Sequence, residues 1–263
     1  MTLPLAQVNG AAIRYRLEGP PGAPALVLCG SLGSDLRMWD RVMPALSGFR
    51  VLRLDARGHG GSAATPGPYS VELLAADVRE LMEQLGVRRP HLCGLSLGGM
   101  IATRLAAQVH DGVASLVLCN TAARMARPEV YEERIERVRA GGLAPLVDGI
   151  LSVWFTAGFR AERPEVVALG REMLLSCSPL GYAAACAAVR DHDARPWLDG
   201  IRAPTLVVAG AEDLATTPAD GRFLAEHIPG ARYLELPAAH LSALEAGPAL
   251  GEQLASFLAR EGP

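Results

Sequence analysis

Short apolar runs occur in the first half of the chain and return near its end. Runs of this kind are typical of strands that are covered on both faces of a sheet. They predict strands at residues 25–29, 50–54, 91–95, 113–119, 205–210 and 231–236. Two further short strands, 3–8 and 12–18, flank Asn9-Gly10, a pair suited to a type I′ hairpin turn. The pattern therefore predicts eight strands in all.

Amphipathic segments separate these apolar runs. The clearest spans residues 71–85, where apolar side chains recur at helical spacing between a capping Ser70 and a terminating Gly86. Further helices are predicted at residues 38–46, 100–109, 219–227 and 249–260. Because strands and helices alternate, we expect an α/β protein with a mostly parallel eight-stranded sheet and helices on both faces.

The alternation stops after Asn120 and resumes after residue 195. Between these points no buried-strand run occurs, and helical patterns are predicted at residues 129–140, 143–155, 164–177 and 181–190. An all-helical insertion in an α/β chain suggests a cap over one end of the sheet. The sequence therefore predicts a core domain, residues 1–120 and 196–263, and a helical cap, residues 121–195.

The composition argues against several classes of protein. With 263 residues, 50% hydrophobic and 20% charged, the chain is long enough to bury a large core. Its net charge of −3 provides no electrostatic footprint for nucleic acid. The chain has no apolar run of about 18 residues, the length that suggests a membrane helix, and no signal-peptide pattern. We therefore expect a cytoplasmic protein without a membrane partner.

The five cysteines indicate reduced core residues. Their number is odd, their spacing is wide and unlike that of metal ligands, and three lie in apolar strand-like runs. They are Cys29, Cys93, Cys119, Cys177 and Cys186. We expect neither a metal nor another cofactor. The basic residues are all arginines, which bind carboxylates well.

Ser96 lies where the strand 91–95 turns directly into a helix. The segment Gly94-Leu95-Ser96-Leu97-Gly98 has the G-x-S-x-G spacing of a nucleophile elbow. A serine on such a tight turn crowds the backbone, so that a Cβ two positions to either side would collide with neighbouring elements. The pattern predicts a nucleophilic serine, although by itself it also fits a flexible turn.

A general base and an orienting carboxylate follow the last two predicted strands. Asp213, next to Glu212, follows strand 205–210, and His240 follows strand 231–236. Reacting groups in parallel sheets come from loops at the carboxyl ends of strands. The chain order Ser96, Asp213, His240 predicts a catalytic triad, whereas His59, in a glycine-rich turn, is interpreted as structural.

Backbone N–H groups would have to stabilise the oxyanion that such a nucleophile forms. Leu97, directly after Ser96, is expected to supply one donor. The second should come from the glycine-rich turn after strand 25–29, hence from Ser31, or from Leu32 if the turn is offset by one residue.

These motifs resemble those of the α/β-hydrolase superfamily. The resemblance extends to Asp55-Ala56-Arg57-Gly58-His59-Gly60-Gly61-Ser62 and to Gly210-Ala211-Glu212-Asp213 with Ala239-His240. Within the superfamily, the chain resembles the 3-oxoadipate enol-lactone hydrolases, with longer matching segments at residues 30–39, 120–124, 154–156 and 181–191. Cys29-Gly30 replaces the His-Gly pair of many superfamily members, a feature shared by the lactonase-like ones. His192 departs from the resemblance, because an apolar residue is expected there.

The resemblance implies hydrolysis of 3-oxoadipate enol-lactone to 3-oxoadipate through an acyl-enzyme, in the bacterial breakdown of protocatechuate or catechol. Such a substrate carries a free carboxylate that a buried site must pair. Trp154 is a candidate pocket wall. The sequence does not choose among the cap arginines, which are Arg124, Arg127, Arg134, Arg160 and Arg190.

Other functions remain open at this stage. Another carboxylesterase or lactonase, or a carbon–carbon bond hydrolase, would use the same triad. A dehalogenase of this fold is disfavoured because its nucleophile would be an aspartate. A hydrolase-like binding protein is the alternative from another class, and the intact triad argues against it. The sequence does not predict an oligomeric state.

Overall fold

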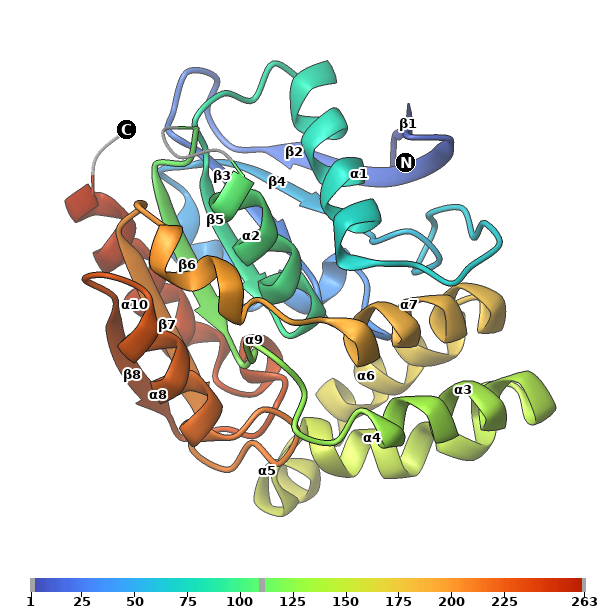
Figure 1. The fold of residues 1–263 in the computed structure, drawn as a ribbon. Helices are drawn as coiled ribbons and strands as arrows, with labels where there is room; N and C mark the ends of the chain where they lie inside the picture. Colours follow the sequence, from blue (N-terminus) through green and yellow to red (C-terminus); the bar gives the residue numbers. More distant parts are fainter. Residues whose placement is uncertain (1–2, 109–111, 262–263) are drawn as a thin grey trace.

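One mixed sheet forms the centre of the computed structural model, which describes residues 3–108 and 112–261 (Figure 1). The strand order is β1-β2-β4-β3-β5-β6-β7-β8. The strands are β1 (Leu5–Val8), β2 (Ala11–Glu18), β3 (Ala25–Cys29), β4 (Arg50–Leu54), β5 (His91–Leu95), β6 (Ser115–Cys119), β7 (Thr205–Gly210) and β8 (Arg232–Leu236). β2 pairs antiparallel with both β1 and β4, and the neighbouring pairs from β4 to β8 are parallel. The predicted eight-stranded, mostly parallel sheet is confirmed.

The hairpin between β1 and β2 has the predicted turn chemistry. Asn9 and Gly10 have φ values of 47° and 76°, and a type I′ turn requires positive φ at both central residues. Asparagine and glycine adopt this conformation at the lowest steric cost.

Helices cover both faces of the sheet, as predicted. α1 (Val71–Gln84), α2 (Leu97–Gln108) and α8 (Pro218–His227) lie on one face, and α10 (Gly247–Glu261), preceded by the short α9 (Ser242–Glu245), lies on the other. Ser70 caps α1 by accepting a hydrogen bond from the Leu73 N–H, as its position predicted. Val109, the predicted last residue of the helix that begins near Met100, lies outside the described residues.

The predicted helix at residues 38–46 is wrong. Two short 3₁₀ helices, Leu36–Trp39 and Met43–Leu46, take its place. Pro44 has no N–H to donate, and it lies in the first turn of the second piece. The Asp35 side chain caps the first piece by accepting from the Arg37 N–H. The segment therefore folds as two separate turns.

The chain between β6 and β7 is helical, as predicted. It contains α3 (Glu129–Gly141), α4 (Val147–Trp154), α5 (Ala157–Glu162), α6 (Pro164–Ser176) and α7 (Pro179–Asp191). Figure 1 shows these helices grouped beyond the end of the sheet toward which the parallel strands point. The predicted helix at residues 143–155 is interrupted, because a 3₁₀ turn containing Pro145 precedes α4. The division into a core domain and a cap domain stays a prediction.

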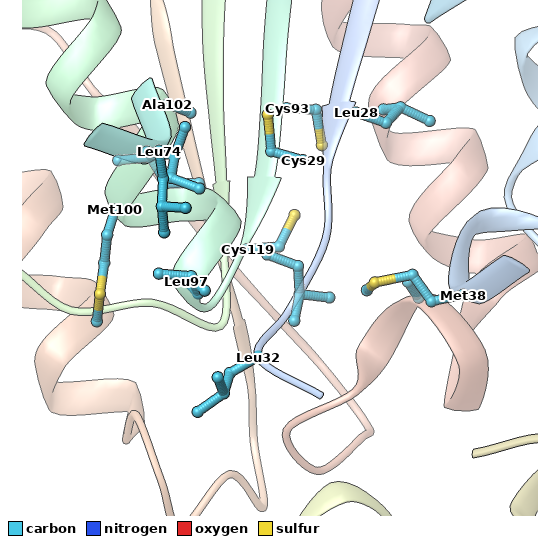
Figure 2. Close-up of a cluster of buried hydrophobic side chains, with 14 of the residues drawn as sticks. Leu28, Cys29, Leu32, Met38, Leu74, Cys93, Leu97, Met100, Ala102 and Cys119 are labelled. Atoms are coloured by element: carbon cyan, nitrogen blue, oxygen red, sulfur yellow. The ribbon is translucent and has the colours of Figure 1, made fainter. Parts of the chain in front are cut away.

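All five cysteines are buried and carry free thiols. Figure 2 shows three of them, Cys29, Cys93 and Cys119, among apolar side chains. These three come from the neighbouring strands β3, β5 and β6. Burial raises the pKa of Cys29 to about 12, so its thiol is protonated and is not a nucleophile at neutral pH.

Two further features of the described residues bear on the sequence predictions. No helix in residues 3–108 and 112–261 is by itself long and apolar enough to cross a membrane, and α6 and α7 meet that test only as a pair bent by 98°. Within the same residues no group of three or more His, Cys, Asp or Glu side chains is arranged to hold a metal ion.

Candidate active site

Ser96 occupies a strained turn between β5 and α2. Its φ is 56°, in the left-handed region that few residues other than glycine adopt. A Cβ at Gly94 would lie 2.0 Å from the Gly98 carbonyl oxygen, and a Cβ at Gly98 would lie 2.0 Å from the Cys29 carbonyl oxygen. Only glycine fits at either position. The spacing that identified the elbow in the sequence therefore has a direct steric cause.

The three residues of the predicted triad lie in hydrogen-bond contact. The Ser96 Oγ is 3.0 Å from the His240 Nε2, and the His240 Nδ1 is 2.8 Å from the Asp213 Oδ2. All three side chains are buried, whereas Glu212 is exposed. Because a carboxylate only accepts, we assign the imidazole proton to Nδ1, which leaves Nε2 free to accept from the serine hydroxyl.

The Asp213 carboxylate is held by its own loop. Its Oδ1 accepts from the N–H groups of Ala215 and Thr216, and its Oδ2 accepts from the Thr216 hydroxyl. Burial opposes ionisation, but the adjacent His240 and the hydrogen bonds from His240, Asn120 and Thr216 lower the pKa of Asp213. The carboxylate is thus ionised and fixed in orientation.

Two residues at the end of β6 also support the triad, and the sequence reasoning gave them no role. Asn120 Nδ2 lies 3.0 Å from the Asp213 Oδ2, and the Thr121 hydroxyl donates to the Ser96 carbonyl oxygen at 2.8 Å. The available signal was their position, since both directly follow a strand that lies between those leading to Ser96 and Asp213.

The structure distinguishes the two candidates for the second oxyanion donor. The Ser31 N–H donates to the Met38 Sδ at 3.3 Å, so it is already occupied. Within residues 3–108 and 112–261, neither the Leu32 N–H nor the Leu97 N–H makes a hydrogen bond. The N–H groups of Leu32, which lines the cavity beside Ser96, and of Leu97, which follows Ser96, are therefore free to act as donors, whereas that of Ser31 is not.

A small cavity opens beside Ser96 and His240, with an empty volume of about 350 Å³. Its walls are mainly apolar, with one guanidinium. The lining residues are Ser31, Leu32, Ser96, Tyr131, Arg134, Ile150, Val153, Trp154, Ala215 and His240.

Among the candidate substrate-binding residues, only Arg134 and Trp154 line this cavity. Arg134, from α3, lies 5.2 Å from the Tyr131 ring centroid and 3.4 Å from the Tyr182 hydroxyl oxygen. It forms no ion pair with any of the described carboxylates. Burial raises the pKa of Tyr131 to about 12, so its hydroxyl is neutral beside this cation.

The other candidate arginines lie away from the cavity. Arg190 pairs with Glu132 and Asp191. Arg124, Arg127 and Arg160 are exposed, and Arg127 also pairs with Glu129. The structure therefore places Arg134 alone, of the five cap arginines, where it could contact a ligand bound at Ser96.

Among the described residues, three buried histidines lie outside the triad, and two of them, His59 and His192, concern the sequence predictions. His59 Nδ1 faces the Arg57 carbonyl oxygen within its own turn, which agrees with a structural interpretation. His192 follows the last residue of α7 and packs edge-on against Trp197, with ring centroids 6.2 Å apart. Neither residue lines the cavity.

The loop that carries His240 is tied to the end of α4. The Leu241 N–H donates to the Trp154 carbonyl oxygen at 2.9 Å. Glu245 provides a second connection, because its carboxylate accepts from the Ala239 N–H at 2.8 Å and from the Thr156 hydroxyl at 2.6 Å. The general-base candidate is thus positioned partly by the helical segment above the sheet.

Comparison with known proteins assigns the chain to a family. A family model described as the alpha/beta hydrolase fold matches residues 24–247. The chain belongs to the α/β-hydrolase family. It is 35% identical over 250 residues to 3-oxoadipate enol-lactonase 2 of Acinetobacter baylyi, covering 95% of this chain and 94% of that protein.

Solved α/β-hydrolase structures agree with this assignment. The crystal structure of the enol-lactonase from Burkholderia xenovorans LB400 is 45% identical, with a TM-score of 0.96 over 97% of this chain and all of that one. A malate-bound thermophilic esterase from Thermogutta terrifontis is 29% identical, with a TM-score of 0.92 over the whole of both chains. The resemblance inferred from the motifs is confirmed, including its similarity to enol-lactonases.

The family assignment accounts for the position of each candidate. In this α/β-hydrolase, Ser96 follows β5, Asp213 follows β7 and His240 follows β8, all at the carboxyl ends of parallel strands. Side chains that are distant in sequence thereby come together at one edge of the sheet.

Proposed function

We propose that this α/β-hydrolase is a serine hydrolase that opens a small lactone carrying a free carboxylate. The proposed substrate is 3-oxoadipate enol-lactone, an intermediate of aromatic catabolism. The proposal rests above all on one observation: the Ser96–His240–Asp213 hydrogen-bond chain borders a cavity that is also lined by Arg134, which forms no ion pair with the described carboxylates. The choice of this particular lactone rests on the similarity of the chain to enol-lactonases.

Acylation would begin when the Ser96 Oγ attacks the lactone carbonyl carbon and gives its proton to the His240 Nε2. Asp213 holds the imidazole in the required orientation and stabilises its charged form. The Leu32 and Leu97 N–H groups would receive the oxyanion. Their lack of other partners supports this role, because an occupied donor could not respond to the developing charge.

Collapse of the tetrahedral intermediate breaks the ring C–O bond. The leaving oxygen departs as an enolate, which is a better leaving group than an alkoxide. The enolate takes up the proton that His240 accepted from Ser96 and becomes a ketone, which leaves the imidazole neutral for the next step. Water then gives a proton to His240 and attacks the acyl carbon, which releases Ser96 and the second carboxylate. These steps consume one lactone and one water and yield 3-oxoadipate.

Arg134 is the proposed partner of the substrate carboxylate. A guanidinium binds a carboxylate through two parallel hydrogen bonds, and the interaction strengthens where water is excluded. Tyr131 and Trp154 would form the sides of the ring pocket. The malate ligand named for the similar esterase is a dicarboxylate, which is consistent with an acidic ligand in this part of the family.

The helical segment, residues 121–195, would act as the cap that encloses the substrate. This segment contributes Tyr131, Arg134 and Trp154 to the cavity, whereas the reacting groups lie in the turns and loops that follow the strands. Because of this division, family members with the same reacting groups can differ in substrate, since the cap forms the pocket and the reacting groups stay the same.

Turnover of synthetic 3-oxoadipate enol-lactone, measured beside p-nitrophenyl acetate, tests the proposal. We expect kcat/KM to be much higher for the enol-lactone, and Ser96→Ala to lower kcat by at least about 10³-fold with an unchanged fold. Fast ester cleavage without lactone turnover would favour another esterase or a carbon–carbon bond hydrolase. Tight ligand binding without turnover of either compound would favour a binding protein. Full activity in Ser96→Ala would refute the mechanism.

A further inference from the structure

The Asn120 side chain joins three parts of the site. Its Nδ2 lies 3.0 Å from the Asp213 Oδ2 and 3.1 Å from the Ala239 carbonyl oxygen, and its Oδ1 accepts from the Ser242 hydroxyl. The carboxylate and the carbonyl only accept, so the amide nitrogen must face them. Asn120 therefore links the acid loop to the residue directly before His240.

The backbone is built around this amide. Asn120 has a φ of 45°, a left-handed conformation that asparagine tolerates better than most residues. At the end of β7, a Cβ on Gly210 would lie 2.8 Å from the Asn120 Nδ2 and 2.3 Å from the Ala239 carbonyl oxygen. The absence of a side chain at Gly210 leaves the space that the amide occupies. Asn120 itself is only 2% exposed, so water does not replace these contacts.

We propose that Asn120 is a positioning residue, whose amide holds Asp213 and the Ala239–His240 segment in the register that aims His240 at Ser96. This inference rests on the proposed serine-hydrolase function. It assigns no contact with substrate to Asn120. The amide acts through Asp213 on one side and through the Ala239 carbonyl on the other.

The amide also affects the charge balance of the triad. The Asp213 Oδ2 accepts from His240, Thr216 and Asn120, so three donors share its negative charge. Loss of the Asn120 donor leaves more of that charge facing the imidazole, which stabilises its protonated form.

Other ionisable groups lie near Asp213 and His240 and are the same in the parent protein and in the Asn120 variants. Tyr131 and Arg134 of α3 line the cavity beside His240. Glu245 of α9 accepts from the Ala239 N–H. None of them is altered by a substitution at Asn120.

The rate at which a fluorophosphonate labels Ser96, measured across pH, tests the inference without requiring the natural substrate. Asn120→Gly removes the amide and tolerates the positive φ. We expect labelling to be at least about tenfold slower, because a hydrogen bond to a charged group that positions His240 is lost. Asn9→Gly is the matched control, since Asn9 has a φ of 47° and its amide donates to the Asp77 carboxylate far from Ser96.

Asn120→Asp provides a second test, with a side chain of the same size. Its protonated carboxyl can donate to Asp213 as the amide does, whereas its ionised form repels Asp213. We expect this variant to lose labelling as pH rises, through an alkaline limb that the parent protein lacks. A purely structural role would not create such a limb.

The outcomes separate this inference from the proposed function. Labelling profiles of both Asn120 variants that match the parent and Asn9→Gly would overturn the role of Asn120 and leave the triad intact. A folded parent protein whose Ser96 is not labelled at any pH would overturn the proposed function itself, and this inference with it. Slower labelling of Asn120→Gly beside a normal rate in Asn9→Gly, or a new alkaline limb in Asn120→Asp, supports the inference.

Discussion

Arg134 is the residue whose chemistry is most specific to the proposed substrate. Replacement by glutamine would remove the charge and keep most of the side chain. Because a buried charge pair would be broken, we expect KM for the enol-lactone to rise roughly 100-fold and KM for p-nitrophenyl acetate to stay nearly unchanged. Steady-state kinetics on both compounds measure the difference.

Arg160→Gln serves as the control for Arg134, because Arg160 is an exposed arginine of the same helical segment outside the cavity. Equal changes in KM for the acidic lactone and the neutral ester in Arg134→Gln would contradict a carboxylate-binding role. An effect of Arg160→Gln as large as that of Arg134→Gln would point to long-range electrostatics instead.

The residues differ in how far the sequence alone could identify them. Ser96, Asp213 and His240 were identifiable because glycine spacing and strand-end positions are local signals with a steric or topological cause. The choice of Arg134 depends on which face of α3 borders the cavity, and the sequence alone does not distinguish it from the other cap arginines. The choice of Leu32 depends on the Met38 sulfur that occupies the Ser31 N–H. Such contacts arise only when distant segments pack together.

At the scale of elements, the connection between α4 and the His240 loop predicts a coupling of the cap to catalysis. Thr156→Val keeps the shape of the side chain and removes the hydroxyl, which donates to Glu245 and also caps α5 by accepting from the Phe159 N–H. We expect kcat to fall about three- to tenfold with little change in KM, because one hydrogen bond to a charged group positions the base and not the substrate. Steady-state kinetics measure kcat and KM, and a thermal unfolding curve measures the stability of the variant.

Ser152→Ala in α4 is a suitable control for this coupling, since the Ser152 hydroxyl donates only to the Gly149 carbonyl oxygen of its own helix and is exposed. An unchanged kcat in Thr156→Val, or an equal loss in Ser152→Ala, would show that the connection does not affect the general base.

Element boundaries followed the sequence where hydrophobic spacing and caps agree. α1, α3 and α6 lie close to their predicted bounds because each begins at a cap or a proline and has a continuous amphipathic pattern. The segment around Pro44 departs from its prediction, since apolar spacing alone does not reveal a missing N–H donor. Proline position should therefore have outweighed spacing there.

For the whole molecule, sheet topology and burial have separate consequences. The parallel order β5, β6, β7, β8 brings the three triad residues together. The apolar runs predicted these strands and a mostly parallel sheet, but not the spatial order of the strands. Burial also leaves some side-chain polar atoms without a hydrogen-bond partner, and sequence patterns do not indicate which atoms these are. The His192 Nε2 is one of them among the described residues, although the side chain is only 4% exposed.

His192 should make the stability of the fold depend on pH. Burial lowers its pKa from 6.5 to about 4, although Glu72 and Asp193 lie near enough to favour the charged form. The unfolded chain therefore binds a proton at a higher pH than the folded one. The stabilisation is present above about pH 6.5 and is lost as pH falls toward 4, by at most roughly 3 to 4 kcal/mol at about 1.4 kcal/mol per pKa unit.

Urea unfolding at several pH values between 7.5 and 5 measures this dependence. We expect the free energy of unfolding to fall over that interval, and His192→Leu to reduce the slope, because leucine fills the buried site without a titrating group. Part of the slope should remain, since burial also lowers the pKa of His59. His227→Gln, at an exposed histidine of α8, should leave the slope unchanged. If His192→Leu had the parent slope, protonation of His192 would not be coupled to unfolding.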